Sequence, residues 1–274
     1  MHIKEGVVYG ENHAELYFQT YEPDVTAKAI VIVLHGLGDH SGGLSNIIYR
    51  LIMAHYKVYA FDLRGHGRSS GKRGFVKTWT DYRGDLHAIR KLASQEHPDL
   101  PLLLVAHSLG GLISLDYALH HGDGLSGMVV ISPAIAFEVK SSHKLLIYLM
   151  NVIKPDYSVE HKGNFTQLND SANVKLEKDA LRHNLVTPGM GRAMLYIIPQ
   201  IRQRAGELKV PVLLQYGLED KITSPEKLRA FFKHMGSQDK QKREYEGAGH
   251  RPFDESGRER CLNDMVKWIE NHLK

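Results

Sequence analysis

Short, almost continuously apolar runs recur along the chain and are separated by stretches of helical length. They occupy residues 29–34 (AIVIVL), 56–61 (YKVYAF), 102–106 (LLLVA), 128–131 (MVVI) and 210–216 (VPVLLQY). Strands that are buried on both faces, as in a parallel sheet between two layers of helices, have this pattern instead of a strict alternation. The runs therefore predict the central strands of a mostly parallel sheet.

The segments between the runs have helical spacing, and the chain start has a different pattern. The first twenty residues alternate between apolar and polar positions, which indicates an antiparallel hairpin at one edge of the sheet. A further strand is expected at residues 242–246. The expected helices cover residues 44–55, 81–97, 108–121, a segment opened by Ser224-Pro225, and residues 255–273. Alternating strands and helices predict an α/β fold with helices on both faces of the sheet.

This rhythm is interrupted by an insertion. Residues 133–187 contain an apolar helix, predicted at 145–153, and a polar stretch at 161–175, but no convincing buried strand. A new helix is expected from Pro188 to about residue 204, with Thr187 as its N-cap. The predicted domains are thus a core made of residues 1–132 and 188–274 and a cap, or lid, made of residues 133–187.

Composition excludes several classes of protein. Of the 274 residues, 42% are hydrophobic and 24% are charged, which is typical of a globular protein and not of a disordered or fibrous one. The formal net charge of +4 is too small and too evenly spread to indicate a nucleic-acid partner. A single cysteine, Cys261, excludes an intrachain disulfide and a multi-cysteine zinc site. The 17 histidines are unusually many.

The sequence has no recognisable targeting or membrane-spanning segment. The N-terminus lacks the apolar core of a signal peptide, and the apolar stretch at 145–153 is far shorter than the roughly 20 residues of a membrane span. We therefore expect a cytoplasmic protein, with the cap as the part that could contact a membrane surface.

Residues 106–111 (AHSLGG) follow an apolar run and open a predicted helix. A serine in a strand–turn–helix, flanked by small residues, is typical of the nucleophile elbow G-x-S-x-G, and Ala106 is small enough to replace the first glycine. The N–H groups at the start of the helix suit a developing oxyanion. Ser108 is therefore the candidate nucleophile, and the alternative is a serine that only caps the helix.

A serine nucleophile needs a base, and the base needs an orienting acid. In this architecture both come from the carboxyl ends of later strands, with the acid before the histidine. Glu219 and Asp220 follow the run at 210–216, and Asp220 fits the spacing of such loops better. His250 follows the strand at 242–246 in the sequence GAGH, where glycines allow the loop to approach the serine. Ser108, Asp220 and His250 form the predicted triad.

Residues 36–41 (GLGDHS) also approximate a dinucleotide-binding pattern, G-x-G-x-x-G, with Asp62 where a ribose-binding acid would lie. Ser41 replaces the third glycine and would crowd the helix against the strand. A dinucleotide site is therefore the weaker interpretation.

Several stretches resemble the α/β-hydrolases of the monoacylglycerol lipase and lysophospholipase type, a serine aminopeptidase S33-type hydrolase family. These stretches are LHGLGDHSGG, VYAFDLRGHGRSSG, VAHSLGG, VLLQYGLEDKITSPE and YEGAGH, and they cover essentially the whole core. The resemblance implies an α/β-hydrolase fold with an inserted helical cap, with Ser108 as nucleophile, Asp220 as acid and His250 as base. It also implies an oxyanion hole formed by the backbone N–H groups of Leu37 and Leu109.

The resemblance further suggests substrate-binding residues and shows two departures from the family. Asp39 stands where monoacylglycerol lipases carry a glutamate for the glycerol head, whereas Gly43 replaces an arginine and Phe253 replaces a second histidine. An apolar Phe253 favours a less polar alcohol half. In the cap, Leu145 and Leu149 are expected to line the acyl cleft or to contact a membrane surface, and ordinary packing on the core is the alternative.

Together these features predict a serine carboxylic-ester hydrolase that acts on fatty-acyl esters through an acyl-enzyme and needs no metal or cofactor. The substrate would be a monoacylglycerol, a lysophospholipid or a simple ester, and Arg251 offers a positive charge for a phosphate head group. The expected partner is this small-molecule acyl ester.

Two other classes of protein remain open. A non-catalytic binding protein of this fold usually lacks a member of the triad, whereas this chain keeps all three. A proline-iminopeptidase-like aminopeptidase would need acids to hold a free amino terminus, and the cap offers Glu138, Asp156, Glu160, Asp170, Glu177 and Asp179.

Overall fold

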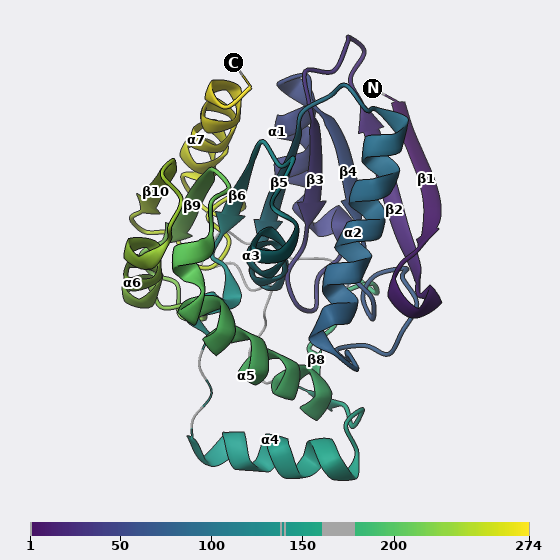
Figure 1. Ribbon diagram of the computed structural model, residues 1–274, viewed down its shortest axis with the longest axis vertical. Coiled ribbons are helices and arrows are strands. Elements are labelled where there is room, and N and C mark those ends of the chain that lie inside the picture. The colour runs from purple at the N-terminus through teal and green to yellow at the C-terminus, as the bar shows by residue number, and fades with distance from the viewer. Residues whose placement is uncertain (1, 138, 140, 161–178, 274) are drawn as a thin grey trace.

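The sheet is mostly parallel, as the apolar runs predicted. The computed structural model describes residues 2–137, 139, 141–160 and 179–273. Within these residues eight strands form one sheet in the order β1-β2-β4-β3-β5-β6-β9-β10, and every neighbouring pair from β4 to β10 is parallel (Figure 1). The strands are β1 (His2–Tyr9), β2 (Glu15–Glu22), β3 (Ile30–Leu34), β4 (Lys57–Phe61), β5 (Leu102–His107), β6 (Gly127–Ile131), β9 (Val212–Gly217) and β10 (Lys240–Tyr245).

The predicted N-terminal hairpin lies at one edge of this sheet. β1 pairs with β2 in antiparallel register from His2 opposite Glu22 to Tyr9 opposite Glu15. β2 is also antiparallel to β4, with Phe18 opposite Phe61, so the hairpin joins the parallel strands at their outer side. The alternation of the first twenty residues follows from this position, because an edge hairpin keeps one face in contact with water.

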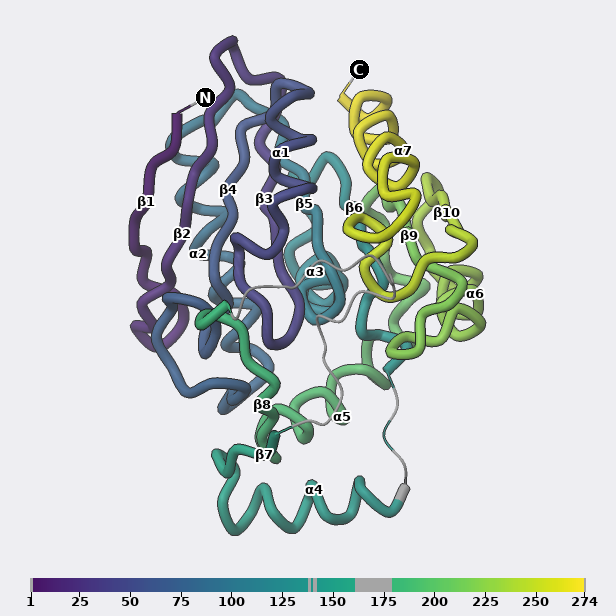
Figure 2. The backbone as a smooth tube through the Cα atoms, turned by 180° about the vertical axis from the view of Figure 1, so that it is seen from behind, coloured from purple at the N-terminus to yellow at the C-terminus, as the bar shows by residue number. Residues whose placement is uncertain are grey.

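Helices cover both faces of the sheet. α1 (Ser45–Met53) and α7 (Arg258–Asn271) lie on one face, which is nearest the viewer in Figure 2. α2 (Trp79–Glu96), α3 (Leu109–His121) and α6 (Pro225–His234) lie on the other face (Figure 1). Alternate residues of β3 point to opposite sides: Ile30, Ile32 and Leu34 pack in the apolar cluster under α2 and α3, whereas Val31 and Val33 pack under α1 and α7. Burial on both sides explains the continuous apolar runs.

The cap lies between β6 and α5 (Pro188–Gln203). Within it, α4 (Ser141–Ile153) packs against α5 and lies farthest from the sheet, and β7 (Val159–Glu160) pairs with β8 (Leu185–Val186) (Figure 1). The predicted start of α5 is confirmed, because the Thr187 hydroxyl accepts a hydrogen bond from the Met190 N–H at 3.2 Å and Pro188 is the first helical residue. The polar stretch 161–175 lies outside the described residues, and the cap boundaries 133–187 remain a prediction.

Helix ends differ from the prediction where the backbone leaves the helical region. α3 begins at Leu109 and not at Ser108, which has a φ of 52°. α7 begins at Arg258, later than predicted, because Gly257 has a φ of 81°. α4 begins at Ser141, earlier than predicted from its apolar stretch. Among the helices that the structure describes, none combines the length and the hydropathy needed to cross a membrane.

Candidate active site

Ser108 lies in the tight turn between β5 and α3. Its φ of 52° and ψ of −112° are rare for a residue with a side chain. The turn brings α3 very close to β3: the Gly110 N–H donates to the His35 carbonyl at 3.1 Å, and a Cβ on Gly110 would lie 2.7 Å from the carbonyl oxygen of Leu34. Only glycine permits this approach, so the small-residue pattern around Ser108 reflects the geometry of the turn.

The predicted triad residues meet at the carboxyl edge of the sheet. Ser108 follows β5, Asp220 follows β9, and His250 follows β10. Ser108 Oγ lies 3.0 Å from His250 Nε2, and His250 Nδ1 lies 2.8 Å from Asp220 Oδ2. A carboxylate only accepts hydrogen bonds, so His250 Nδ1 carries the proton and Nε2 is left to accept the hydroxyl hydrogen of Ser108. All three side chains are buried.

The Asp220 carboxylate is held by its own loop as well as by His250. Oδ1 accepts the N–H groups of Ile222 at 2.7 Å and Thr223 at 2.9 Å, and Oδ2 accepts the Thr223 hydroxyl at 2.5 Å. Burial raises the pKa of Asp220, but the hydrogen bonds from His250 and Thr223 and the positive charge that His250 can carry outweigh it, so the pKa lies below its ordinary value. The carboxylate therefore stays ionised. The sequence analysis missed Thr223, although an aspartate that bonds N–H groups two and three residues later is a known turn pattern.

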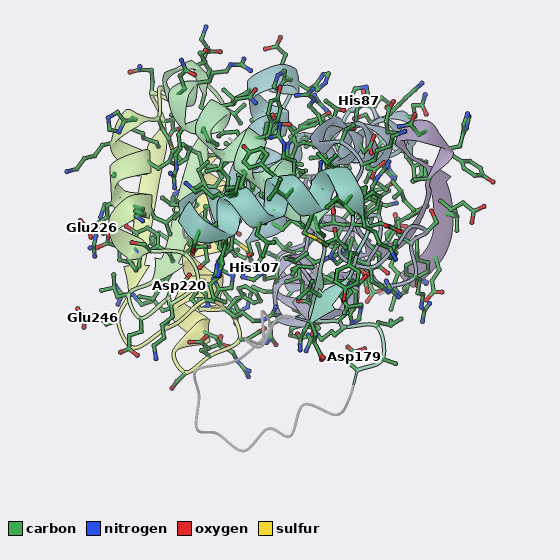
Figure 3. The ribbon with its side chains drawn as sticks, turned by 90° about the horizontal axis from the view of Figure 1, so that it is seen from below. His87, His107, Asp179, Asp220, Glu226 and Glu246 are labelled. Carbon is green, nitrogen blue, oxygen red and sulfur yellow. The ribbon has the colours of Figure 1, made fainter. Side chains whose placement is uncertain are left out.

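The loop that carries His250 is fixed from two sides. Glu255 accepts the N–H of Gly249 at 2.5 Å and that of Arg251 at 3.3 Å. His107, next to the candidate nucleophile, lies with its Nε2 3.0 Å from the His250 carbonyl, to which it donates. Burial, followed by the charges of His250 and Arg251, lowers the pKa of His107 well below its ordinary value. His107 is thus a neutral donor. Figure 3 shows it and Asp220 beyond the cap helix α4, seen from below.

The two predicted oxyanion donors flank the Ser108 turn. Leu37 lies in the turn after β3, which is closed by a hydrogen bond from the Asp39 N–H to the Gly36 carbonyl at 3.3 Å, and Leu109 is the first residue of α3. Neither N–H donates a hydrogen bond to any residue in the described part of the chain. Gly36 lies against the nucleophile turn, since a Cβ there would be 3.1 Å from the Ser108 Cβ. Both N–H groups have the free donor capacity that an oxyanion hole needs, and the role remains a prediction.

Contrary to expectation, Asp39 presents no free carboxylate oxygen to a head group. Oδ2 accepts Arg251 Nη1 at 2.6 Å, and Oδ1 accepts Arg182 Nε at 2.9 Å. Burial raises the pKa of Asp39, but the charges of Arg251 and Arg182 outweigh it and hold the pKa well below its ordinary value. Arg251 is equally engaged, because it also donates to the Gly43 carbonyl at 2.7 Å and to Asp254 at 2.7 Å. The expected positive charge for a phosphate is therefore already compensated.

The structure also locates the other predicted substrate contacts. Phe253 has no exposed surface and packs edge-on against the His107 ring, with 5.1 Å between ring centroids. Because it is buried against His107, Phe253 offers no exposed surface to a substrate. Leu145 and Leu149 face outward on α4, where 64% and 55% of their surfaces are exposed. These two side chains therefore do not pack on the core, and their expected role in the acyl cleft or at a membrane surface stays a prediction.

The cap segment before β8 is attached to the loop that holds Leu37. The His183 N–H donates to the Gly38 carbonyl at 2.9 Å, Asp179 lies 2.7 Å from His40 Nε2, and Arg182 reaches Asp39 as described. Nothing in the sequence pattern pointed to Arg182.

Two of the cap acids that could hold the free amino terminus of an aminopeptidase substrate are already paired with cationic or histidine side chains. Asp179 is paired with His40, and Asp156 is paired with Lys72 at 2.7 Å. Glu160 lies in β7. Glu138, Asp170 and Glu177 lie outside the described residues.

The residues considered for a dinucleotide are engaged elsewhere. Asp62 accepts the backbone N–H groups of Ser41 at 2.7 Å and Arg68 at 2.8 Å, which holds the loop after β4 against the loop after β3. In the described ranges, no group of three or more histidine, cysteine, aspartate or glutamate side chains is arranged to hold a metal ion.

Comparison with known proteins identifies the family of the chain. Residues 25–257 match the serine aminopeptidase S33 family. The monoacylglycerol lipase of Mycolicibacterium smegmatis is 28% identical over 268 residues, which is 96% of both chains. The monoglyceride lipase of Rattus norvegicus is 28% identical over 240 residues, which is 86% of this chain and 79% of that one.

Among solved structures, the monoacylglycerol lipase of Paleococcus ferrophilus superposes with a TM-score of 0.84 at 31% identity, covering 94% of this chain and 99% of that one. The carboxyl esterase of Bacillus coagulans has the same fold, with a TM-score of 0.86 at 21% identity and full coverage of both chains. The chain therefore belongs to the serine aminopeptidase S33 family and is an ester-hydrolysing α/β-hydrolase similar to monoacylglycerol lipases.

Proposed function

We propose that the chain hydrolyses fatty-acyl esters through an acyl-enzyme formed on Ser108. The observation that carries the proposal is the continuous path of hydrogen bonds from Ser108 Oγ to His250 Nε2 and from His250 Nδ1 to Asp220. Such a path makes a serine hydroxyl nucleophilic, because the histidine can accept its proton while the carboxylate fixes the tautomer.

In the first step, Ser108 Oγ attacks the ester carbonyl carbon and its proton passes to His250 Nε2. Asp220 stabilises the imidazolium, and the N–H groups of Leu37 and Leu109 donate to the oxyanion. The ester C–O bond then breaks, and the alcohol leaves with the proton from His250. In the second step, water attacks the acyl carbonyl, His250 accepts its proton, and the fatty acid is released as Ser108 regains a proton.

Monoacylglycerol is the first substrate that we propose. Relatives that match nearly the whole chain are named as monoacylglycerol lipases, which supports this choice. The alcohol half would be recognised differently from the family pattern, because Asp39 and Arg251 compensate each other and Phe253 is buried. A compensated Arg251 also makes a lysophospholipid less favoured than a monoacylglycerol or a simple ester.

The Ser108→Ala variant tests the mechanism. We expect it to lose activity by about 10⁴-fold or more, since the nucleophile is removed, while its unfolding transition stays unchanged. Turnover is measured on p-nitrophenyl esters of increasing chain length, monoacylglycerol, lysophosphatidylcholine and an amino-acyl amide. Ser114→Ala, a buried serine in the same helix α3, is the matched control and should keep its activity. Full activity of Ser108→Ala would overturn the mechanism, and turnover of the amide alone would favour an aminopeptidase.

We also propose that the cap makes transient contact with a lipid surface. Val152 and Ile153 expose 83% and 76% of their surfaces near the end of α4, next to the exposed Leu145 and Leu149. Transfer of such side chains into an interface is favourable in proportion to their apolar area.

The Val152→Glu/Ile153→Glu double variant tests this contact. We expect its co-sedimentation with phosphatidylcholine vesicles to fall by about tenfold or more, because two apolar anchors become charged. Hydrolysis of a short, water-soluble p-nitrophenyl ester should stay unchanged. Met53→Glu, at an exposed apolar position on α1, is the control. Equal vesicle binding by the double variant and the unchanged protein would contradict the proposal.

A further inference from the structure

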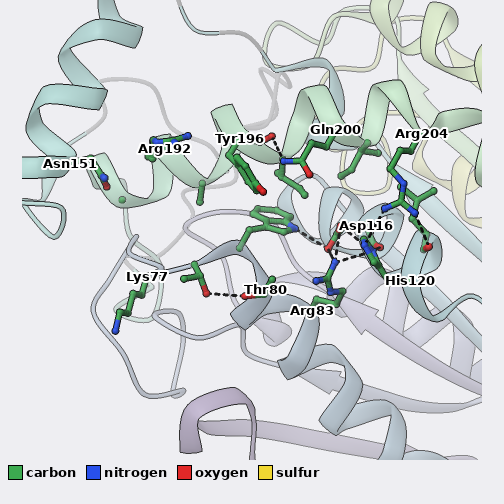
Figure 4. A pocket seen from close by; sticks show the side chains of 17 residues that line it. Lys77, Thr80, Arg83, Asp116, His120, Asn151, Arg192, Tyr196, Gln200 and Arg204 are labelled. Atoms are coloured by element: carbon green, nitrogen blue, oxygen red, sulfur yellow. Dashed lines mark hydrogen bonds and ion pairs between the residues drawn. The ribbon is translucent and has the colours of Figure 1, made fainter.

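A cavity of about 600 Å³ lies between α2, α3 and α5 (Figure 4). None of the triad residues lines it. On α3 its lining consists of Asp116, Leu119 and His120, in the second half of the helix, whereas Ser108 precedes the first turn. At about 1.5 Å of rise per residue, these positions are more than roughly 10 Å apart along the helix. The cavity is therefore separate from the proposed active site.

Four cationic residues are among those that line this cavity. Lys77 and Arg83 come from α2 and the residues before it, and Arg192 and Arg204 come from α5 and its end, as Figure 4 shows. Asp116 is the one carboxylate among the lining residues given for the cavity, and it is buried. Arg83 Nη1 lies 3.4 Å from each of its oxygens, which is within ion-pair distance but long for a hydrogen bond. Arg204 is also paired with Glu207, which lies outside the cavity lining, at 2.8 Å, so the positive charge of the cavity is compensated in part.

His120 lies between two of these arginines but can accept a hydrogen bond from only one of them. Its Nδ1 lies 2.9 Å from Arg83 Nη1, and its Nε2 lies 3.1 Å from Arg204 Nη1. Nδ1 also lies 2.8 Å from the Asp116 carbonyl, to which it can only donate. A neutral imidazole has one acceptor nitrogen, which here is Nε2 and serves Arg204. Arg83 therefore faces an N–H group and keeps donor capacity for another acceptor.

The other cations of the cavity are also available. Within the described ranges, neither Lys77 nor Arg192 forms an ion pair with a carboxylate. The guanidinium of Arg192 lies over the rings of Tyr148 and Tyr196, at 4.6 and 5.9 Å from the centroids. Stacking on aromatic faces leaves the in-plane N–H donors of a guanidinium free for an anion.

The cavity also has an apolar part. The buried side chains of Trp79, Ala193, Ile197 and Ile201 line it, and Tyr196 lies at its margin with 56% of its surface exposed. Several guanidinium and ammonium donors beside an apolar wall suit a doubly charged, multi-oxygen anion that carries a hydrocarbon or aromatic body. We propose that this cavity is a binding site for an organic phosphate ester, with the phosphate at the arginines and the apolar body against Trp79.

The proposal is tested by calorimetric titration of the full chain with hexyl phosphate. We expect saturable binding that weakens with salt and that falls by about tenfold or more in the Lys77→Gln/Arg192→Gln variant, because charge-assisted hydrogen bonds to phosphate are lost. Arg243→Gln/Lys267→Gln removes the same charge from β10 and α7, outside the cavity, and should bind like the unchanged protein. Thermal unfolding of both variants verifies that they are folded.

Two further measurements separate the sites and the sources of the phosphate. Protein that is blocked at Ser108 with a fluorophosphonate should bind hexyl phosphate equally well, since the cavity is distinct from the triad. Binding to phosphatidylglycerol vesicles that depends on Lys77 and Arg192 would assign the phosphate to a lipid head group, whereas binding of hexyl phosphate without such vesicle dependence would assign it to a soluble ester. No saturable binding, equal loss in both double variants, or loss on blocking Ser108 would overturn the proposal.

Discussion

Asp39 and Arg251 form a buried ion pair below the loop that carries Leu37, and their side chains are only 1% and 2% exposed. A charge that loses its partner in such a place cannot be solvated, so breaking the pair costs far more than breaking an exposed one. Arg251 directly follows His250 in the chain. The pair therefore ties the loop that carries His250, the predicted base, to the loop of the predicted oxyanion hole.

The Asp39→Asn variant should lower the free energy of unfolding by roughly 3 kcal/mol, because Arg251 and Arg182 lose the carboxylate that compensates them. Urea denaturation measures the change. Glu270→Gln is the matched control: its partner Lys28 is 3.7 Å away and both side chains are 47% exposed, so the change should stay within about 0.5 kcal/mol. Equal costs for the two variants would show that burial does not set the strength of the pair.

At the scale of elements, the start of α3 depends on contact with the end of β3. Gly110 lies against the backbone of Leu34 and His35, and a Cβ there would be 2.7 Å from both carbonyl oxygens. Backbone atoms cannot move aside as a flexible side chain can. A larger residue must therefore shift the helix, and with it Ser108 and the N–H of Leu109.

We expect Gly110→Ala to destabilise the protein by about 1–3 kcal/mol, as overpacking at a rigid contact does, and to reduce ester hydrolysis by at least about tenfold. Gly206→Ala is the control, since its Cβ would have no atom within 4 Å. Chemical denaturation and turnover of a p-nitrophenyl ester are the measurements. If both glycine variants retained full activity and stability, the close approach at Gly110 would not be essential.

At the scale of the whole molecule, the many histidines connect separate parts of the fold. The rings of His35, His66 and His183 follow one another from the end of β3 to the cap, with centroid distances of 5.2 and 4.8 Å. Burial lowers the pKa of His66 well below its ordinary value of 6.5, and burial lowers the pKa of His183 to about 4. These rings are therefore neutral in the folded protein at neutral pH.

Acid should destabilise the protein from about pH 6.5 downward. Below that pH the unfolded chain binds protons at His66 and His107 that the folded chain does not, so stability falls as pH falls, and for His183 the loss ends near pH 4. Thermal unfolding between about pH 7.5 and pH 5 measures the slope. His66→Gln should flatten it, whereas the exposed His143→Gln should not. An unchanged midpoint across this range would contradict the prediction.

Much of the fold could be predicted because its causes are local. Continuous apolar runs mark strands that must be covered on both faces, and Thr187-Pro188 marks a helix start whose cap needs only neighbouring residues. The order of Ser108, Asp220 and His250 was also informative, since the carboxyl ends of parallel strands meet at one edge. The sequence by itself thus determined the α/β architecture and the identity of the three residues that meet.

Only the tertiary structure decided how these residues are supported and what surrounds them. Whether Asp39 is free or paired depends on Arg251, which is more than two hundred residues away in the chain. Likewise, His107 supports His250, and the cavity at Trp79 joins segments of α2, α3 and α5. A local pattern cannot encode such pairings, because burial and charge compensation depend on contacts that form only when distant segments pack together.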